Sequence, residues 1–106
     1  MKKKLVWFAA TGALAFASAP ALAQDAQQLL KDKACLACHN VDNKVVGPAY
    51  KDVAKKYRAR KDADDYLSKK IREGSNGVWG QVPMPPNSTV SEAEAKTLAK
   101  YILSLK

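Results

Sequence analysis

The two cysteines and the single histidine of this chain lie within five residues, Cys35-Leu36-Ala37-Cys38-His39. This C-x-x-C-H spacing is typical of covalent haem attachment, in which two thiols add across the haem vinyl groups and the adjacent imidazole ligates the iron. A redox-active dithiol is an alternative, but that function favours a βαβ context. A structural zinc site needs about four protein ligands, and these residues supply three.

The first 23 residues have the pattern of a secretory signal peptide. Lys2, Lys3 and Lys4 form a basic start, residues 5–17 are uncharged and largely apolar, and Ala21 and Ala23 form an A-x-A cleavage site before Gln24. The alternative is an uncleaved anchor, but the apolar stretch is short for the roughly 20 residues of a membrane-spanning helix. We therefore expect residues 1–23 to be cleaved and residues 24–106 to form one domain.

Cleavage changes the composition of the chain. The remaining part has 15 basic and 10 acidic residues, a net charge of +5, and keeps one methionine, Met84, and one tryptophan, Trp79. Nucleic-acid binding is the usual alternative explanation for a basic chain, and export argues against it. A domain of about 80 residues also buries little apolar surface, so a haem would add the core that it lacks.

Met84 is the candidate for a second iron ligand. A single methionine is usually core filler, but Met84 lies between Pro83 and Pro85 in a long loop, residues 75–87, that the prolines stiffen. If His39 and Met84 fill both axial positions, the iron has no open site for a substrate, and the expected activity is electron transfer. The alternative is a haem enzyme or gas sensor in which Met84 is absent from the iron or easily displaced.

The remaining pattern predicts helices and loops without strands. Apolar spacing predicts helices over residues 25–34, with Asp25 as N-cap, and 49–60. A third helix should begin at Asp64-Asp65 and end before Gly74, and a fourth should begin at a capping box, Ser91 with Glu94, and continue to Leu105. Lys51, Lys55, Lys56 and Arg58 share the outer face of the second helix, either as a solvated face or as a docking surface.

From about Asp25 to Lys106 the chain resembles the small bacterial class I cytochromes c of the cytochrome c-551 type, also called cytochrome c8. Besides the haem motif, the matching stretches are Val46-Gly47-Pro48-Ala49-Tyr50-Lys51-Asp52-Val53-Ala54, Gly77-Val78-Trp79-Gly80, Pro83-Met84-Pro85-Pro86-Asn87 and Thr97-Leu98-Ala99-Lys100. The resemblance implies an all-α class I cytochrome c fold, with four to five short helices wrapped around one haem c linked to Cys35 and Cys38.

The resemblance also implies roles for individual residues. His39 and Met84 would be the axial ligands, and the Pro48 carbonyl would accept a hydrogen bond from the His39 imidazole. The Trp79 indole would donate to a haem propionate, or only pack on the haem, and the Asn87 amide would support the methionine ligand. One difference from the family is Lys69-Lys70 where an arginine would lie near the propionate, since lysine cannot make the bidentate guanidinium contact.

The family's role is to carry single electrons in the periplasm. Donors would be a membrane quinol-oxidising complex or another small carrier such as a copper protein, and acceptors would be terminal reductases such as nitrite reductase, as in denitrification, or oxidases. A charge of +5 predicts transient docking to acidic partner surfaces that weakens as salt rises. The expected protein is a monomer that is not an enzyme, does not bind nucleic acid and does not stay in the membrane.

Overall fold

The structure is a computed structural model that describes residues 2–4, 12 and 22–106, with side chains in the first helix described from Ala26. Most of the predicted signal peptide, including Ala21, lies outside the described residues. Within them the elements are α1 (Leu22–Asp32), the 3₁₀ helix η1 (Cys35–Ala37), α2 (Tyr50–Tyr57), α3 (Ala63–Glu73) and α4 (Glu92–Ser104). The described residues contain only isolated β-bridges and no strand, so the predicted all-α fold is confirmed.

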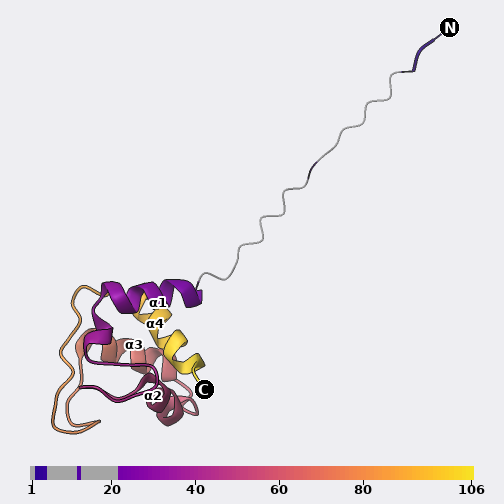
Figure 1. Cartoon of the computed structure of the whole chain (residues 1–106). Coiled ribbons are helices and arrows are strands. Elements are labelled where there is room, and N and C mark those ends of the chain that lie inside the picture. Colours follow the sequence, from indigo (N-terminus) through magenta and orange to yellow (C-terminus); the bar gives the residue numbers. More distant parts are fainter. Residues whose placement is uncertain (1, 5–11, 13–21) are drawn as a thin grey trace.

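The C-terminal helix α4 is the element against which the other helices pack. It contacts α1, α2 and α3 (Figure 1). Its buried residues follow helical spacing: Ala95, Leu98, Ala99 and Ile102. Ala95 and Ala99 are fully buried, and their small side chains let the neighbouring helices approach closely. The capping box is present, because the Ser91 N–H donates to Glu94 Oε1 at 2.9 Å and the Glu94 N–H donates to Ser91 Oγ at 3.1 Å.

Helix α1 differs from the prediction at its start. It begins at Leu22, so Asp25 lies inside the helix and the prediction that Asp25 is the N-cap is wrong for the full chain. The physical reason is that Leu22, Ala23 and Gln24 all favour helix and contain no competing cap or breaker. The predicted apolar face is confirmed by the burial of Ala26 and Leu30 against α4.

Lys33 follows α1 and ties it to the start of α4. Its Nζ donates to the Thr89 carbonyl at 2.8 Å and lies 3.6 Å from the Glu94 carboxylate. Lys33 therefore holds the segment that leads into Cys35 against the N-terminal end of α4, where the capping box lies.

Helix α2 ends at Tyr57, three residues before the predicted end. After it the Arg60 N–H donates to the Tyr57 carbonyl at 2.9 Å, and the Arg60 guanidinium lies 3.8 Å from the ring centroid of Tyr66. The first of these contacts is a local turn and the second reaches into α3, and together they turn the chain toward α3 where local helix propensity favours continuation. The predicted buried face of α2 is confirmed, with Tyr50, Val53, Ala54 and Tyr57 all buried.

Helix α3 ends at Glu73, directly before Gly74, as predicted. Leu67 and Ile71 supply its buried face, and Ser68 is the only buried polar residue among those described. The following loop returns past the end of α3 and reaches α4. Among the described residues no helix has both the length and the apolar character that crossing a membrane requires.

Candidate functional site

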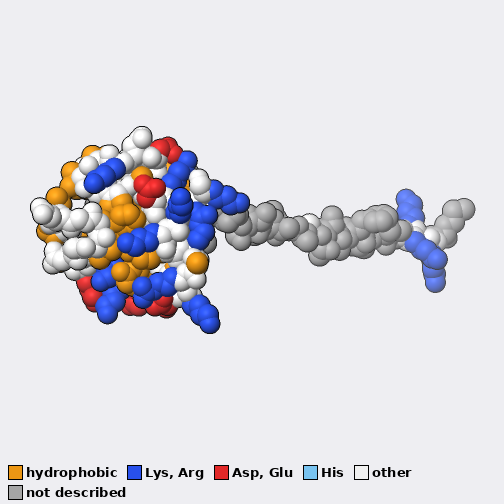
Figure 2. Space-filling view, turned by 90° about the horizontal axis from the view of Figure 1, so that it is seen from below, with side chains coloured by type: hydrophobic (Ala, Val, Ile, Leu, Met, Phe, Trp, Pro, Cys, Tyr) orange, Lys and Arg blue, Asp and Glu red, His pale blue; other side chains and the backbone are white. Residues whose placement is uncertain are grey.

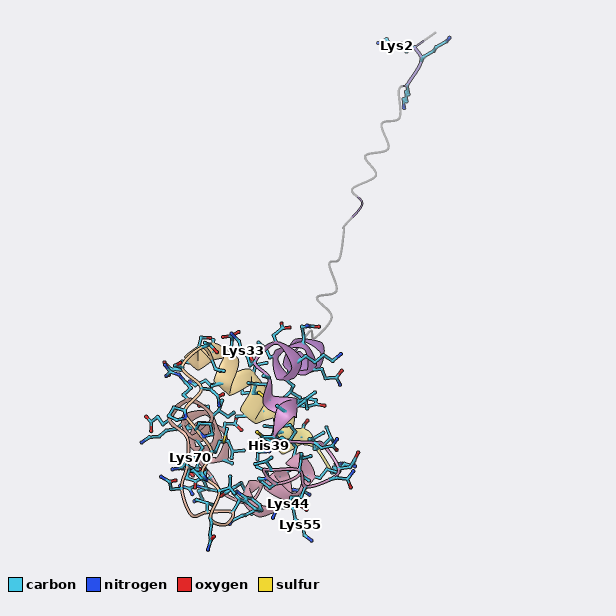
Figure 3. All side chains as sticks on the ribbon, turned by 60° about the vertical axis from the view of Figure 1, so that its left-hand side comes forward. Lys2, Lys33, His39, Lys44, Lys55 and Lys70 are labelled. Atoms are coloured by element: carbon cyan, nitrogen blue, oxygen red, sulfur yellow. The ribbon has the colours of Figure 1, made fainter. Side chains whose placement is uncertain are left out.

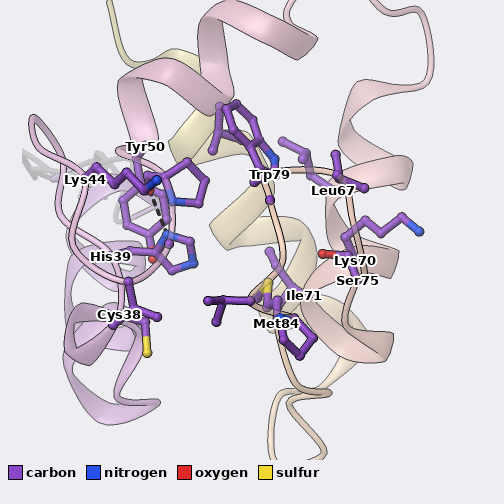
Figure 4. A pocket seen from close by; sticks show the side chains of 18 of the residues that line it. Cys38, His39, Lys44, Tyr50, Leu67, Lys70, Ile71, Ser75, Trp79 and Met84 are labelled. Carbon is purple, nitrogen blue, oxygen red and sulfur yellow. Dashed lines mark hydrogen bonds between the residues drawn. The ribbon is translucent and has the colours of Figure 1, made fainter.

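A cavity opens between the C-x-x-C-H segment with its following loop on one side and α3 with the loop 75–85 on the other. Figure 4 shows His39 on one side of this cavity and Met84 on the opposite side. The lining is largely apolar, and its aliphatic residues include Val46, Val53, Leu67, Ile71, Val82 and Ile102. The predicted site residues that line the cavity are Cys38, His39, Pro48, Trp79 and Met84.

The C-x-x-C-H segment is a tight turn. Ala34 adopts the left-handed conformation, with φ 58° and ψ 25°, and η1 follows it directly. The Cys35 carbonyl accepts hydrogen bonds from the N–H groups of Cys38, at 3.2 Å, and His39, at 3.0 Å. Cys35 is half-buried against the core and Cys38 is exposed. Burial raises the pKa of the Cys35 thiol, although a hydrogen bond with Tyr50 partly opposes this.

The His39 imidazole is oriented by the loop that follows it. Its Nδ1 lies 2.8 Å from the Pro48 carbonyl oxygen. Because a carbonyl oxygen can only accept, Nδ1 carries the hydrogen, and in the neutral ring Nε2 then keeps its lone pair. The loop is held to the motif by the Gly47 N–H, which donates to the Cys38 carbonyl at 2.7 Å. The ring therefore presents Nε2 as the atom available for a metal.

Met84 is anchored to the residue after Gly74. The Met84 N–H donates to the Ser75 carbonyl at 2.9 Å, and the Ser75 N–H donates to the Met84 carbonyl at 3.0 Å. Met84 is half-buried, although Pro83 and Pro85 on either side of it are exposed. The thioether is thus placed by the end of α3 as well as by the prolines of its own loop.

Asn87 contacts the end of α3, and its expected support of the methionine ligand stays a prediction. Its side-chain Nδ2 donates to the Ile71 carbonyl at 2.9 Å, and its backbone N–H points to the same oxygen at 3.3 Å. Among the described residues no hydrogen bond joins Asn87 to Met84. Asn87 therefore fastens the part of the loop that follows Met84 to the last turn of α3.

Trp79 and Lys70 both line the cavity, and Figure 4 shows Trp79 at the top of the view and Lys70 at the right. The Trp79 ring meets Tyr57 edge-on, with centroids 6.3 Å apart, and the Lys56 ammonium lies 4.6 Å from the Trp79 centroid. Lys70 lies 5.4 Å from the Tyr66 centroid. Trp79 thus lies at the edge of an apolar cavity, and the contact of its indole N–H with a haem propionate stays a prediction.

The alternative chemistries have less support in this geometry. Among the described residues no three His, Cys, Asp or Glu side chains gather into a group that could hold a metal ion. The cavity instead offers one imidazole nitrogen and one thioether sulfur across an apolar space, with a thiol at its edge. That donor set fits a haem, whose apolar ring needs burial and whose iron takes one axial ligand on each face.

A family model described as Cytochrome c matches residues 23–106 of the chain. The chain belongs to the cytochrome c family. As a small class I cytochrome c, it carries haem c with its iron, bound covalently through the two cysteines, and functions in electron transport.

Individual relatives cover most of the cytochrome c domain. The chain is 62% identical over 80 residues to cytochrome c-552 of Hydrogenobacter thermophilus, covering 76% of this chain and 81% of that protein. It is 55% identical over 106 residues to cytochrome c-551 of Stutzerimonas stutzeri, with full coverage of both. The crystal structure of Nitrosomonas europaea cytochrome c552 matches with a TM-score of 0.74 and 59% identity, covering 76% of this chain and 99% of that one.

Three residues of this cytochrome c site were missed by the sequence analysis. Tyr50 stacks on His39, Gly47 lies against the His39 ring, and Ser75 pairs with Met84. Tyr50 follows Pro48 closely, so a search for aromatic residues near the expected carbonyl would have found it. The Ser75 pairing has no sequence signal, because it is made entirely by backbone atoms.

Proposed function

We propose that this cytochrome c is a soluble periplasmic electron carrier in which His39 and Met84 ligate the haem iron. The observation that carries the proposal is the position of these two side chains on opposite sides of one apolar cavity (Figure 4). When bound, the haem supplies the one-electron Fe(III)/Fe(II) couple. With both axial positions held by protein, no substrate coordinates to the iron, and electrons pass by outer-sphere transfer.

The residues of the chain have separate tasks in this proposal. Cys35 and Cys38 supply the thioether links, and Pro48 keeps the His39 ring in the tautomer that leaves Nε2 available. Met84 supplies a neutral sulfur ligand. A thioether ligand and an apolar pocket both disfavour the extra positive charge of the oxidised iron, so together they raise the reduction potential.

The sequence of the first 23 residues supports the periplasmic location. The basic start, the apolar stretch and the A-x-A site form a signal peptide at residues 1–23, and cleavage before Gln24 releases the domain 24–106. Covalent haem attachment then takes place on the exported chain, and the mature carrier is a monomer without a membrane anchor.

The proposed partners are redox proteins that dock transiently. Among the residues whose side chains the structure describes, six large apolar ones are exposed, and most of them line the cavity: Leu36, Val45, Val46, Val78, Trp79 and Val82. Figure 2 shows apolar side chains gathered on one face with lysine and arginine side chains beside them. An apolar rim with positive charge around it suits an acidic surface on a quinol-oxidising complex or small copper protein as donor, and on nitrite reductase or a terminal oxidase as acceptor.

The basic residues of α2, and Arg58 directly after it, are not equally available for docking. Lys51 pairs with Asp42, Lys56 lies over Trp79, and the Arg58 guanidinium donates to the Leu105 carbonyl at 3.2 Å. Lys55, at the surface of the domain in Figure 3, makes no ion pair or hydrogen bond with the described residues. Lys55 is therefore the α2 cation that can pair with a partner without breaking an internal contact.

Replacing Met84 tests the ligation directly. Met84→Ala removes the thioether, so the reduced protein should bind carbon monoxide, whereas the wild-type protein should not. Val82→Ala is the matched control, because Val82 is an exposed apolar residue of the same loop. Exclusion of carbon monoxide by Met84→Ala would show that Met84 is not the ligand. Binding by the wild type would favour the haem enzyme or gas sensor.

A further inference from the structure

We propose that Gly74, the residue that ends α3, is a positioning residue for Met84. The inference rests on the proposed ligation of the iron by Met84. The absence of a side chain at Gly74 lets the backbone of the Met84 segment lie directly on the end of α3. A methyl group at this position should loosen Met84 from the iron and leave the helices intact.

The first observation is the backbone conformation of Gly74. Its φ is 79° and its ψ is −178°, and its N–H donates to the Lys70 carbonyl at 2.8 Å. A positive φ with an extended ψ is essentially restricted to glycine, and even residues that tolerate the left-handed helical region avoid it. This conformation turns the chain at once from α3 into Ser75, the residue that pairs with Met84.

The second observation is the space around Gly74. A Cβ atom built on Gly74 would overlap the carbonyl oxygen of Met84, and it would lie 3.0 Å from Pro86 N and 3.1 Å from the Pro85 carbonyl carbon. All three neighbours are backbone atoms, so no flexible side chain can move aside. Pro85 and Pro86 also have fixed φ angles, so the segment cannot yield by small local rotations and has to move as a unit.

The third observation is that the Met84 segment is fastened to α3 on both sides of this contact. Ser75 and Met84 exchange two backbone hydrogen bonds, at 3.0 and 2.9 Å, and the Asn87 side chain donates to the Ile71 carbonyl at 2.9 Å. A displacement at Gly74 therefore acts on a short segment that carries the Met84 side chain into the cavity. Residues 76–82 between Ser75 and Met84 are exposed, so they offer little resistance to that displacement.

The chain contains a matched control in the same loop. Gly77 also has a positive φ, 72°, but a Cβ built there meets nothing within 4 Å. Gly77→Ala therefore introduces backbone strain without the contact. Gly74→Ala and Gly77→Ala share a positive φ, and only Gly74→Ala adds the contact with the Met84 segment to a conformation that is restricted to glycine.

The test compares wild-type holoprotein, Gly74→Ala and Gly77→Ala, with circular dichroism to verify helix content. The readouts are the far-red ferric absorption band of the iron–methionine bond and the binding of imidazole to the ferric iron. Strain of the size found at such sites predicts that Gly74→Ala loses much of the band and binds imidazole at least about tenfold more tightly than the other two proteins. Equal band intensity and equal imidazole affinity in the two variants would overturn the inference.

A failure of the proposed ligation would look different, because the band would then be absent from the wild-type protein as well. If Gly74→Ala does not fold, amide hydrogen exchange of the wild-type holoprotein tests whether the Met84 segment is anchored at the end of α3. Ser75 and Met84 should be protected, and the amides of residues 76–82 should exchange rapidly. Fast exchange at Ser75 and Met84 would show that the anchor at the end of α3 is not stable, and would overturn the inference.

Discussion

Tyr50 stacks on the imidazole of His39, with ring centroids 4.8 Å apart and an interplanar angle of 20°. The same loop supplies two further contacts to this ring, since the Pro48 carbonyl lies 2.8 Å from Nδ1 and Gly47 lies against the ring atoms. Three residues within four positions thus fix the tautomer, the plane and the position of the imidazole. These protein contacts orient the histidine ring.

Gly47 should tolerate no side chain. A Cβ at this position would lie 2.5 Å from His39 Cε1 and 2.9 Å from Nδ1. Gly47→Ala therefore forces the imidazole out of its place between Tyr50 and the loop, and overpacking of this kind typically costs about 1–3 kcal/mol. Urea unfolding of the holoprotein measures the loss. A variant with wild-type stability and an unchanged His39 hydrogen bond by NMR would contradict the geometry.

Replacing Ala34 with glycine should increase the stability of the protein. Its left-handed backbone, with φ 58°, is unfavourable for a residue with a Cβ atom. We expect Ala34→Gly to stabilise the protein by about 1 kcal/mol, net of the extra freedom that glycine gives to the unfolded chain. Ala37→Gly is the control, because Ala37 lies in η1 without a positive φ, and it should instead destabilise by about 0.5–1 kcal/mol. Thermal unfolding of both variants checks the opposite signs.

Glu94 should make stability depend on acid pH. The hydrogen bond from the Ser91 N–H lowers the pKa of the Glu94 carboxyl, and Lys33 acts in the same direction. A carboxylate whose folded pKa lies below its unfolded value stabilises the fold above the unfolded value, and this contribution is lost as pH falls below about 4. Glu94→Gln keeps a capping oxygen but removes the charge, so its unfolding free energy should fall less steeply from pH 6 to pH 3.

The control for this pH profile is Glu92→Gln. Glu92 lies in the same first turn of α4 but makes no hydrogen bond or ion pair with the described residues. Its replacement should leave the steep acid dependence in place. Equal slopes for Glu94→Gln and the wild-type protein would show that the capping carboxylate is not the titrating group.

Removal of the haem should unfold most of the domain. The four α-helices have 8 to 13 residues, a length at which isolated helices are marginal in water. His39, Met84 and the aliphatic residues around them face the cavity, so without haem they lose the surface on which they pack. A Cys35→Ala, Cys38→Ala double variant without haem should therefore lose most of its far-ultraviolet circular dichroism. Native helix content in that variant would contradict the prediction.

The fold was predictable where periodicity and caps agree. The buried faces of α2 and α4, the capping box at Ser91 and the end of α3 before Gly74 all follow from local sequence. The start of α1 was not predictable, because the residues before Asp25 also favour helix. The end of α2 was not predictable either, because it depends on the contact of Arg60 with Tyr66 in α3. Helix ends depend on such balances of about a kcal/mol, which local patterns do not resolve.

The residues of the candidate site that could hold a haem were predictable from the sequence. The contacts that orient those residues were less predictable. The C-x-x-C-H spacing and the proline-flanked Met84 identify the residues that could hold a haem, and the structure places His39 and Met84 across one cavity. The contacts that orient them were hidden, because the Ser75–Met84 pairing is made by backbone atoms and the contact of Gly47 depends on a missing side chain. The expected support of the methionine ligand by Asn87 stays a prediction, and in the structure the Asn87 amide donates to the Ile71 carbonyl.

We propose that His39 and Met84 hold both axial positions of the haem iron in an exported electron carrier. The visible spectrum of the exported, signal-free protein, oxidised and reduced, with and without carbon monoxide, tests this ligation. We predict a c-type reduced spectrum, a far-red ferric band from the iron–methionine bond, and no change on addition of carbon monoxide. Haem without that band, together with carbon monoxide binding, would show that Met84 does not hold the sixth position of the iron.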